Sequence, residues 1–108
     1  MDQIDEKIRY HRLFDLYQGL LTEKQKTYFQ YYYLDDYSLS EIAEIQGVSR
    51  NAVHDQLKIA IAHLEEYESV LKLESRNKVR AKLIAALKER DLDEETKKLV
   101  ERIERLEE

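Results

Sequence analysis

The sequence predicts an all-α protein, and three observations support this prediction. The chain has 108 residues with no proline and two glycines, so few positions interrupt a helix. Apolar residues recur at helical intervals of three and four along most of the chain. Two segments have the capping-box form, in which Ser or Thr precedes Glu or Gln by three positions. We therefore expect four to six helices in one domain over residues 1–108.

Two helices are predicted before residue 34. The first has apolar residues at near-helical spacing, namely Ile4, Ile8, Leu13, Leu16 and Leu20. Gly19 lies where this helix should end. Thr22 and Gln25 form the first capping box, in which the Thr22 hydroxyl accepts from the Gln25 amide. The second helix should therefore begin after Thr22 and run to about Tyr33.

Aromatic residues crowd the end of this second helix, and they are Tyr28, Phe29, Tyr31, Tyr32 and Tyr33, with Tyr37 in the following loop. Helical spacing places Tyr28 with Tyr32 on one face and Phe29 with Tyr33 on the next. We expect at least half of the rings to fill the core, with hydroxyls at a polar edge. The alternative is that they are stacking platforms for unpaired bases.

Residues 38–66 have the pattern of a helix, a tight turn and a second helix. Ser38 and Glu41 form the second capping box, and Ala43 is small where two helices must approach closely. Gly47 can adopt the positive φ that ends a helix, and Ser49 can cap the next one. Such a helix-turn-helix commonly presents the start of its second helix to the major groove of DNA.

The candidate nucleic-acid-binding residues are the positions expected to be exposed on this second helix, Ser49, Arg50, Asn51, His54, Asp55 and Lys58. Arg50 suits a guanine or a phosphate, Asn51 an adenine and Lys58 a phosphate. Asp55 argues against nucleic-acid binding, because phosphates repel a carboxylate. The repulsion is offset only where the carboxylate accepts a hydrogen bond from a cytosine amino group or pairs with a neighbouring cation. The same motif also serves as a packing unit or a protein-binding surface, and that alternative stays open.

A basic helix is predicted over residues 69–90. The chain has a net charge of −5, yet residues 72–90 contain seven positive and two negative side chains. The candidates for contact with a phosphate backbone are Lys72, Arg76, Lys78, Arg80 and Lys82. We expect Val79, Leu83 and Leu87 to pack inward. The alternative is a solvated face paired with the acidic segment that follows.

An acidic amphipathic helix is predicted over residues 91–108. Acidic residues at its start suit the helix dipole. Leu92, Leu99 and Leu106 repeat at intervals of seven, with Val100 and Ile103 beside them. This stripe is too short for an isolated coiled coil, so it needs either the body of the protein or a second copy. We expect a homodimer.

Several classes of function receive no support from the residues. Without cysteine there is no disulfide and no thiolate metal site. His11, His54 and His63 lack metal-ligand spacing, and no phosphate-binding loop, nucleophile elbow or catalytic pair is present. We therefore expect a binding protein, not an enzyme, with no cofactor or small-molecule substrate. Because neither a signal peptide nor a long apolar run is visible, we expect a cytoplasmic protein without membrane contact.

Parts of the helix-turn-helix resemble known proteins. Glu41-Ile42-Ala43-Glu44-Ile45 and Gly47-Val48-Ser49-Arg50 resemble region 4 of bacterial sigma factors. A wider set resembles the YlxM family of small Gram-positive proteins, and it comprises Tyr37-Ser38-Leu39, Glu41-Ile42-Ala43, Val48-Ser49-Arg50, Ala52-Val53, Asp55, Lys58, Leu64-Glu65 and Tyr67-Glu68. This second resemblance covers essentially the whole chain. Asp55 together with Tyr67-Glu68 separates it from the sigma factors.

The resemblance to the YlxM family implies a function. Its members are encoded beside genes of the signal recognition particle GTPase and are described as DNA-binding or regulatory proteins in that pathway. It thus implies DNA or RNA and the particle's components as partners. The chain departs from the family pattern at Asn51, where glutamine is common, and at Ile59, where a basic residue is common. The alternative is an adaptor that binds the particle's GTPase or RNA.

Overall fold

The computed structural model describes residues 3–106 and confirms the all-α prediction. The described part contains six α-helices and no strand. The helices are α1 (Gln3–Tyr17), α2 (Glu23–Phe29), α3 (Leu39–Gln46), α4 (Arg50–Leu71), α5 (Leu73–Lys88) and α6 (Glu94–Arg105), with a 3₁₀ turn η1 (Gln18–Leu20) and a π-helical turn η2 (Gln30–Leu34). The chain divides into two compact units, Met1–Leu71 and Lys72–Glu108, where the sequence predicted a single domain.

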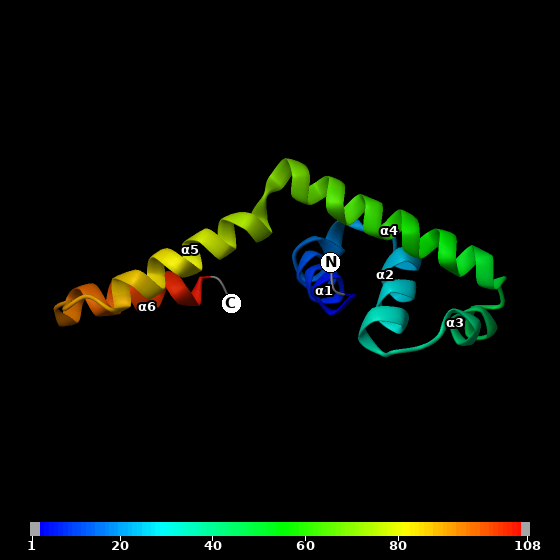
Figure 1. Ribbon diagram of the computed structural model, residues 1–108, viewed down its shortest axis with the longest axis horizontal. Helices are drawn as coiled ribbons and strands as arrows, with labels where there is room; N and C mark the ends of the chain where they lie inside the picture. The colour runs from blue at the N-terminus through cyan, green and yellow to red at the C-terminus, as the bar shows by residue number, and fades with distance from the viewer. Residues whose placement is uncertain (1–2, 107–108) are drawn as a thin grey trace. The chain divides into compact units, whose positions relative to one another are not determined.

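The first unit is built on α4, which contacts α1, α2 and α3 (Figure 1). The side of α4 that faces the other helices carries apolar residues three or four apart, namely Val53, Leu57, Ala60 and Leu64, and all are buried. Val53, Leu57 and Leu64 join a core whose other buried members are Leu13, Phe14, Tyr17, Leu21, Tyr28, Phe29, Ile42 and Ala43. This core holds α3 and the first half of α4 in place.

The aromatic cluster packs into this core. Tyr28 and Phe29 are fully buried, and the Phe29 ring stacks on Phe14 with 4.4 Å between ring centroids. The other four rings, Tyr31, Tyr32, Tyr33 and Tyr37, are half-buried and pack against the same core. The sequence did not predict that the helix widens after Phe29 into the π-helical turn η2, which contains three of these tyrosines.

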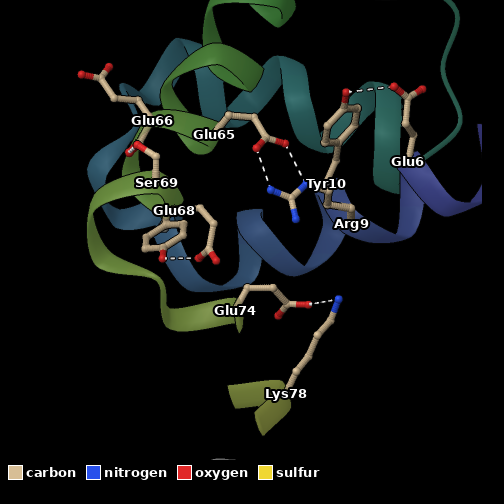
Figure 2. A network of polar contacts seen from close by, with 10 residues as sticks. Glu6, Arg9, Tyr10, Glu65, Glu66, Glu68, Ser69, Glu74 and Lys78 are labelled. Carbon is tan, nitrogen blue, oxygen red and sulfur yellow. Dashed lines mark hydrogen bonds and ion pairs between the residues drawn. The ribbon is translucent and has the colours of Figure 1, made fainter. Parts of the chain in front are cut away.

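Polar contacts join α1 to the second half of α4 (Figure 2). The Arg9 guanidinium donates two hydrogen bonds to the Glu65 carboxylate, at 2.9 and 2.7 Å. Deeper in the unit, the Tyr17 hydroxyl donates to the buried Glu68 carboxylate at 2.7 Å. A two-point guanidinium–carboxylate pair restricts relative rotation of its partners more than a single contact does. These contacts therefore fix the orientation of α4 against α1.

The second unit is an antiparallel hairpin of α5 and α6. Its helices lie inside the predicted ranges 69–90 and 91–108. The first of them starts later than predicted because α4 continues to Leu71 and Lys72 takes a left-handed φ of 56° before α5. Residues 107–108 of the predicted final helix lie outside the described residues. Asp93 caps α6 by accepting from the Thr96 amide at 2.7 Å.

The prediction that Val79, Leu83 and Leu87 of the basic helix pack inward is wrong. Val79, Leu83 and Leu87 are 58%, 62% and 43% exposed, whereas Ile84 is buried against α6 together with Val100. The physical reason is the helical phase. A helix turns by about 100° per residue, so Ile84 points well away from Leu83. The α5 face that meets α6 runs through Ile84, which leaves the predicted row uncovered.

Candidate nucleic-acid interface

The turn of the predicted helix-turn-helix forms at the expected residues. Ser38 and Glu41 make the reciprocal capping-box contacts at 3.1 Å each, so α3 begins at Leu39. Gly47 ends α3 in the left-handed conformation, with φ 68° and ψ 35°. The Val48 amide then donates to the Ala43 carbonyl at 3.0 Å. The chain thus bends sharply at Gly47, as predicted.

The second helix of the motif is α4, and its first turns face solvent. The Ser49 hydroxyl accepts from the Ala52 amide at 3.0 Å and so caps this helix. All six candidate residues are exposed, namely Ser49, Arg50, Asn51, His54, Asp55 and Lys58. Because Val53 and Leu57 occupy the buried side of the same turns, the candidate side chains project away from the core. The structure therefore places them on one accessible surface, which we call the recognition face.

Asp55 lies on the recognition face beside a histidine. Its Oδ1 atom is 3.5 Å from Nδ1 of His54, and both side chains are largely exposed. A protonated His54 would neutralise the carboxylate locally, since the two charges are adjacent. The face therefore combines two permanent cations, Arg50 and Lys58, with one carboxylate whose nearest charge partner is a histidine.

A hollow of about 260 Å³ lies beside the recognition face. Tyr32 and Tyr33 of η2 line it together with His54 and Lys58 of α4, and apolar side chains complete its wall. Burial raises the pKa of Tyr33 to about 12, so this phenol is neutral at physiological pH. The sequence did not predict this hollow, since it depends on how η2 meets α4. The tyrosines thus contribute both to the core and to the surface beside α4.

The basic candidates belong to the second unit. Lys72 lies immediately before α5, and Arg76, Lys78, Arg80 and Lys82 lie on it, all exposed. They do not form one stripe, because helical spacing puts Lys78 and Lys82 on a different side of α5 from Arg76 and Arg80. Lys78 is paired with Glu74 at 3.6 Å (Figure 2), and the Arg80 guanidinium donates to the Asn77 amide oxygen. Part of this charge is therefore already engaged within α5.

Residues 3–106 lack two further kinds of feature. No set of three His, Cys, Asp or Glu side chains is arranged to hold a metal ion. In the same residues, no helix has both the length and the apolar character needed to cross a membrane.

The turn at Gly47 and the exposed start of α4 are the geometry of a helix-turn-helix protein, and comparison with known proteins agrees. Residues 4–104 match the UPF0122 family, described as "Putative helix-turn-helix protein, YlxM / p13 like". The chain belongs to this family. The YlxM resemblance that the sequence indicated is thereby confirmed.

Curated relatives in this YlxM/p13-like family span the same length. A UPF0122 protein of Bacillus thuringiensis (strain Al Hakam) is 48% identical to the chain, over 95% of the chain and 98% of the relative. UPF0122 proteins of Bacillus mycoides (strain KBAB4) and Bacillus anthracis (strain A0248) match with the same identity and coverage. The shared region therefore extends across both units.

Proposed function

We propose that this YlxM-like protein is a regulator that binds duplex DNA, with the first turns of α4 entering the major groove. The observation that carries the proposal is the exposure of all six candidate residues directly after a well-formed turn. The function is one of binding, and the proposal assigns the chain no catalytic step.

Each side chain of the recognition face has a chemical role in this proposal. Arg50 donates to a guanine edge or to a phosphate, and Asn51 pairs with adenine through its amide. Lys58, two turns further along α4, contacts a phosphate. Backbone amides at the capped start of α4 favour an anion, because the helix dipole is positive there. Asp55 accepts from cytosine or stays paired with His54, and either role adds specificity more than affinity.

The pathway assignment rests on the family resemblance. We propose that the regulator acts with the signal recognition particle, whose GTPase genes neighbour those of YlxM proteins. RNA of the particle is then the second nucleic acid to test, because phosphate contacts do not distinguish DNA from RNA.

The test begins with selection of duplexes from a random library, followed by titration of labelled selected DNA and of the particle's RNA at several salt concentrations. We expect Arg50→Glu with Lys58→Glu to weaken DNA binding by about a hundredfold. The slope of affinity against salt should also fall by about one unit for each lost phosphate contact. The control is Lys24→Glu with Lys98→Glu, exposed cations outside residues 49–58 that change the net charge equally.

Two outcomes would contradict the proposal. One is the absence of salt-dependent binding to either nucleic acid. The other is an equal loss of affinity in the recognition-face variant and in its control, which would mean that only the overall charge matters.

An adaptor role is the second candidate, and the exposed carboxylate of Asp55 favours it because phosphates repel such a group. In this alternative the same helices bind the particle's GTPase. Pull-down of that GTPase by wild type and by the Arg50→Glu, Lys58→Glu variant separates the two candidates. A groove-binding protein loses DNA in the variant, whereas an adaptor that does not use these cations keeps its protein partner.

A further inference from the structure

The hairpin of α5 and α6 has an apolar surface. No described residue of this second unit covers it. Its buried large apolar side chains are Ile84 and Val100, whereas others along the two helices are exposed, namely Val79, Leu83, Leu87, Leu99, Ile103 and Leu106. Leu106 is 85% exposed. Small folds need a larger share of buried apolar area than this, or else a partner that supplies it. The hairpin is therefore incomplete as an isolated unit.

The exposed residues of both helices lie on one side of the hairpin. Leu83 precedes the buried Ile84 by one residue, and Leu99 precedes the buried Val100 by one residue. On each helix, the exposed row is therefore rotated by the same angle, about 100°, and in the same sense from the residue that contacts the other helix. In an antiparallel pair of right-handed helices, equal offsets point to the same side of the pair. The rows consequently form a single apolar face, which we call the hairpin face.

The hairpin face has opposite charges at its two ends. Arg76 and Arg80 border it near the start of α5, where they line a shallow depression of about 400 Å³ with Val79 and Leu83. Glu95 lies one helical turn before Leu99, at the start of α6 and close to the tip of the hairpin. The face therefore has two arginines at its open end and Glu95 towards its tip, with apolar side chains between.

We propose that a second copy of this chain covers the hairpin face, so that two hairpins stack antiparallel about a two-fold axis as a four-helix bundle. Antiparallel stacking sets the Arg76 end of each hairpin against the Glu95 end of its partner. Parallel stacking would bring like charges together. This interface goes beyond the proposed binding of nucleic acid and does not depend on it.

The first experiment measures the mass of the full chain by sedimentation equilibrium. We expect a dimer of twice 13.0 kDa. Leu83→Gln with Leu99→Gln should raise the dimer dissociation constant by about a hundredfold or more, because each lost apolar group counts twice in a symmetric interface. Leu20→Gln with Val70→Gln is the matched control, since both residues are exposed in the first unit. A monomeric wild type, or a dimer as stable in the hairpin variant as in the control, overturns the proposal.

A charge exchange tests the antiparallel arrangement and guards against misfolded variants. Arg76→Glu and Glu95→Arg should each weaken the dimer by about fivefold, because each places like charges at both ends of the stack. The combined variant should recover nearly the wild-type dissociation constant, since opposite charges face one another again. Recovery requires a folded hairpin, which circular dichroism checks. If the two effects instead add, the antiparallel arrangement is wrong.

Discussion

Gly47 is the residue that allows the turn between α3 and α4. Its φ of 68° lies in the left-handed region, and a Cβ built there meets no atom within 4 Å. A side chain at this position therefore costs backbone strain and no steric overlap. We predict that Gly47→Ala lowers the free energy of unfolding by about 1 kcal/mol and that Gly47→Asn lowers it less. Urea unfolding measures both, and an alanine variant as stable as wild type would contradict the turn geometry.

Tyr33 connects the stability of the first unit to alkaline pH. Burial raises its pKa from about 10 to about 12, so folding favours the neutral phenol. This stabilisation is complete below pH 10 and is lost as the pH rises from 10 to 12. We predict that the stability difference between wild type and Tyr33→Phe shifts in favour of the variant across this range. Chemical unfolding at a series of pH values measures it, and a constant difference would show that folding does not raise the pKa of Tyr33.

The start of α6 depends on one carboxylate. The pKa of the Asp93 carboxyl group is lowered by hydrogen bonds from the Thr96 side chain and from the Thr96 backbone amide, which donates to it at 2.7 Å. The cap therefore stabilises α6 above the ordinary carboxyl pKa and stops doing so as the pH falls through the lowered value. We predict that Asp93→Ala speeds amide exchange in α6 at neutral pH, and that the difference from wild type shrinks in acid. Intrinsic-rate-corrected hydrogen exchange measures this, and a pH-independent difference would refute the charged cap.

Helix starts were predictable from the sequence because they depend on residues close together in the chain. The Thr22–Gln25 box forms with both hydrogen bonds at 3.1 Å, and the Ser38–Glu41 box does the same. The exposure of the recognition face was also predictable, because the apolar spacing of α4 defines its buried side. These features need no knowledge of distant residues.

Features that depend on tertiary packing were not predictable in the same way. Leu83 and Ile84 are equally apolar, so the sequence does not show which of them meets α6. The π-helical turn after Phe29 likewise lies against helices distant in the chain, α1 and α3. Local spacing cannot supply this information, because it comes from helices that lie elsewhere in the chain.

Dimerisation through the hairpin face would determine the form of the DNA target of the complete protein. A two-fold dimer carries two recognition faces, so selected duplexes should contain two inverted half-sites. Leu83→Gln with Leu99→Gln should weaken binding to the paired half-sites by about tenfold or more, while binding to a single half-site stays unchanged. Titration with both duplexes measures this. Equal affinity of wild type and variant for the paired sites would show that dimerisation does not assist binding.

In the proposed function, the start of α4 is the surface that touches nucleic acid. The most direct measurement is a nuclear magnetic resonance titration of isotope-labelled protein with a selected duplex, which follows every backbone amide. We predict that the largest shift changes fall on residues 49–58 and disappear in the Arg50→Glu, Lys58→Glu variant. Binding accompanied by shift changes elsewhere, with residues 49–58 unmoved, would contradict the claim.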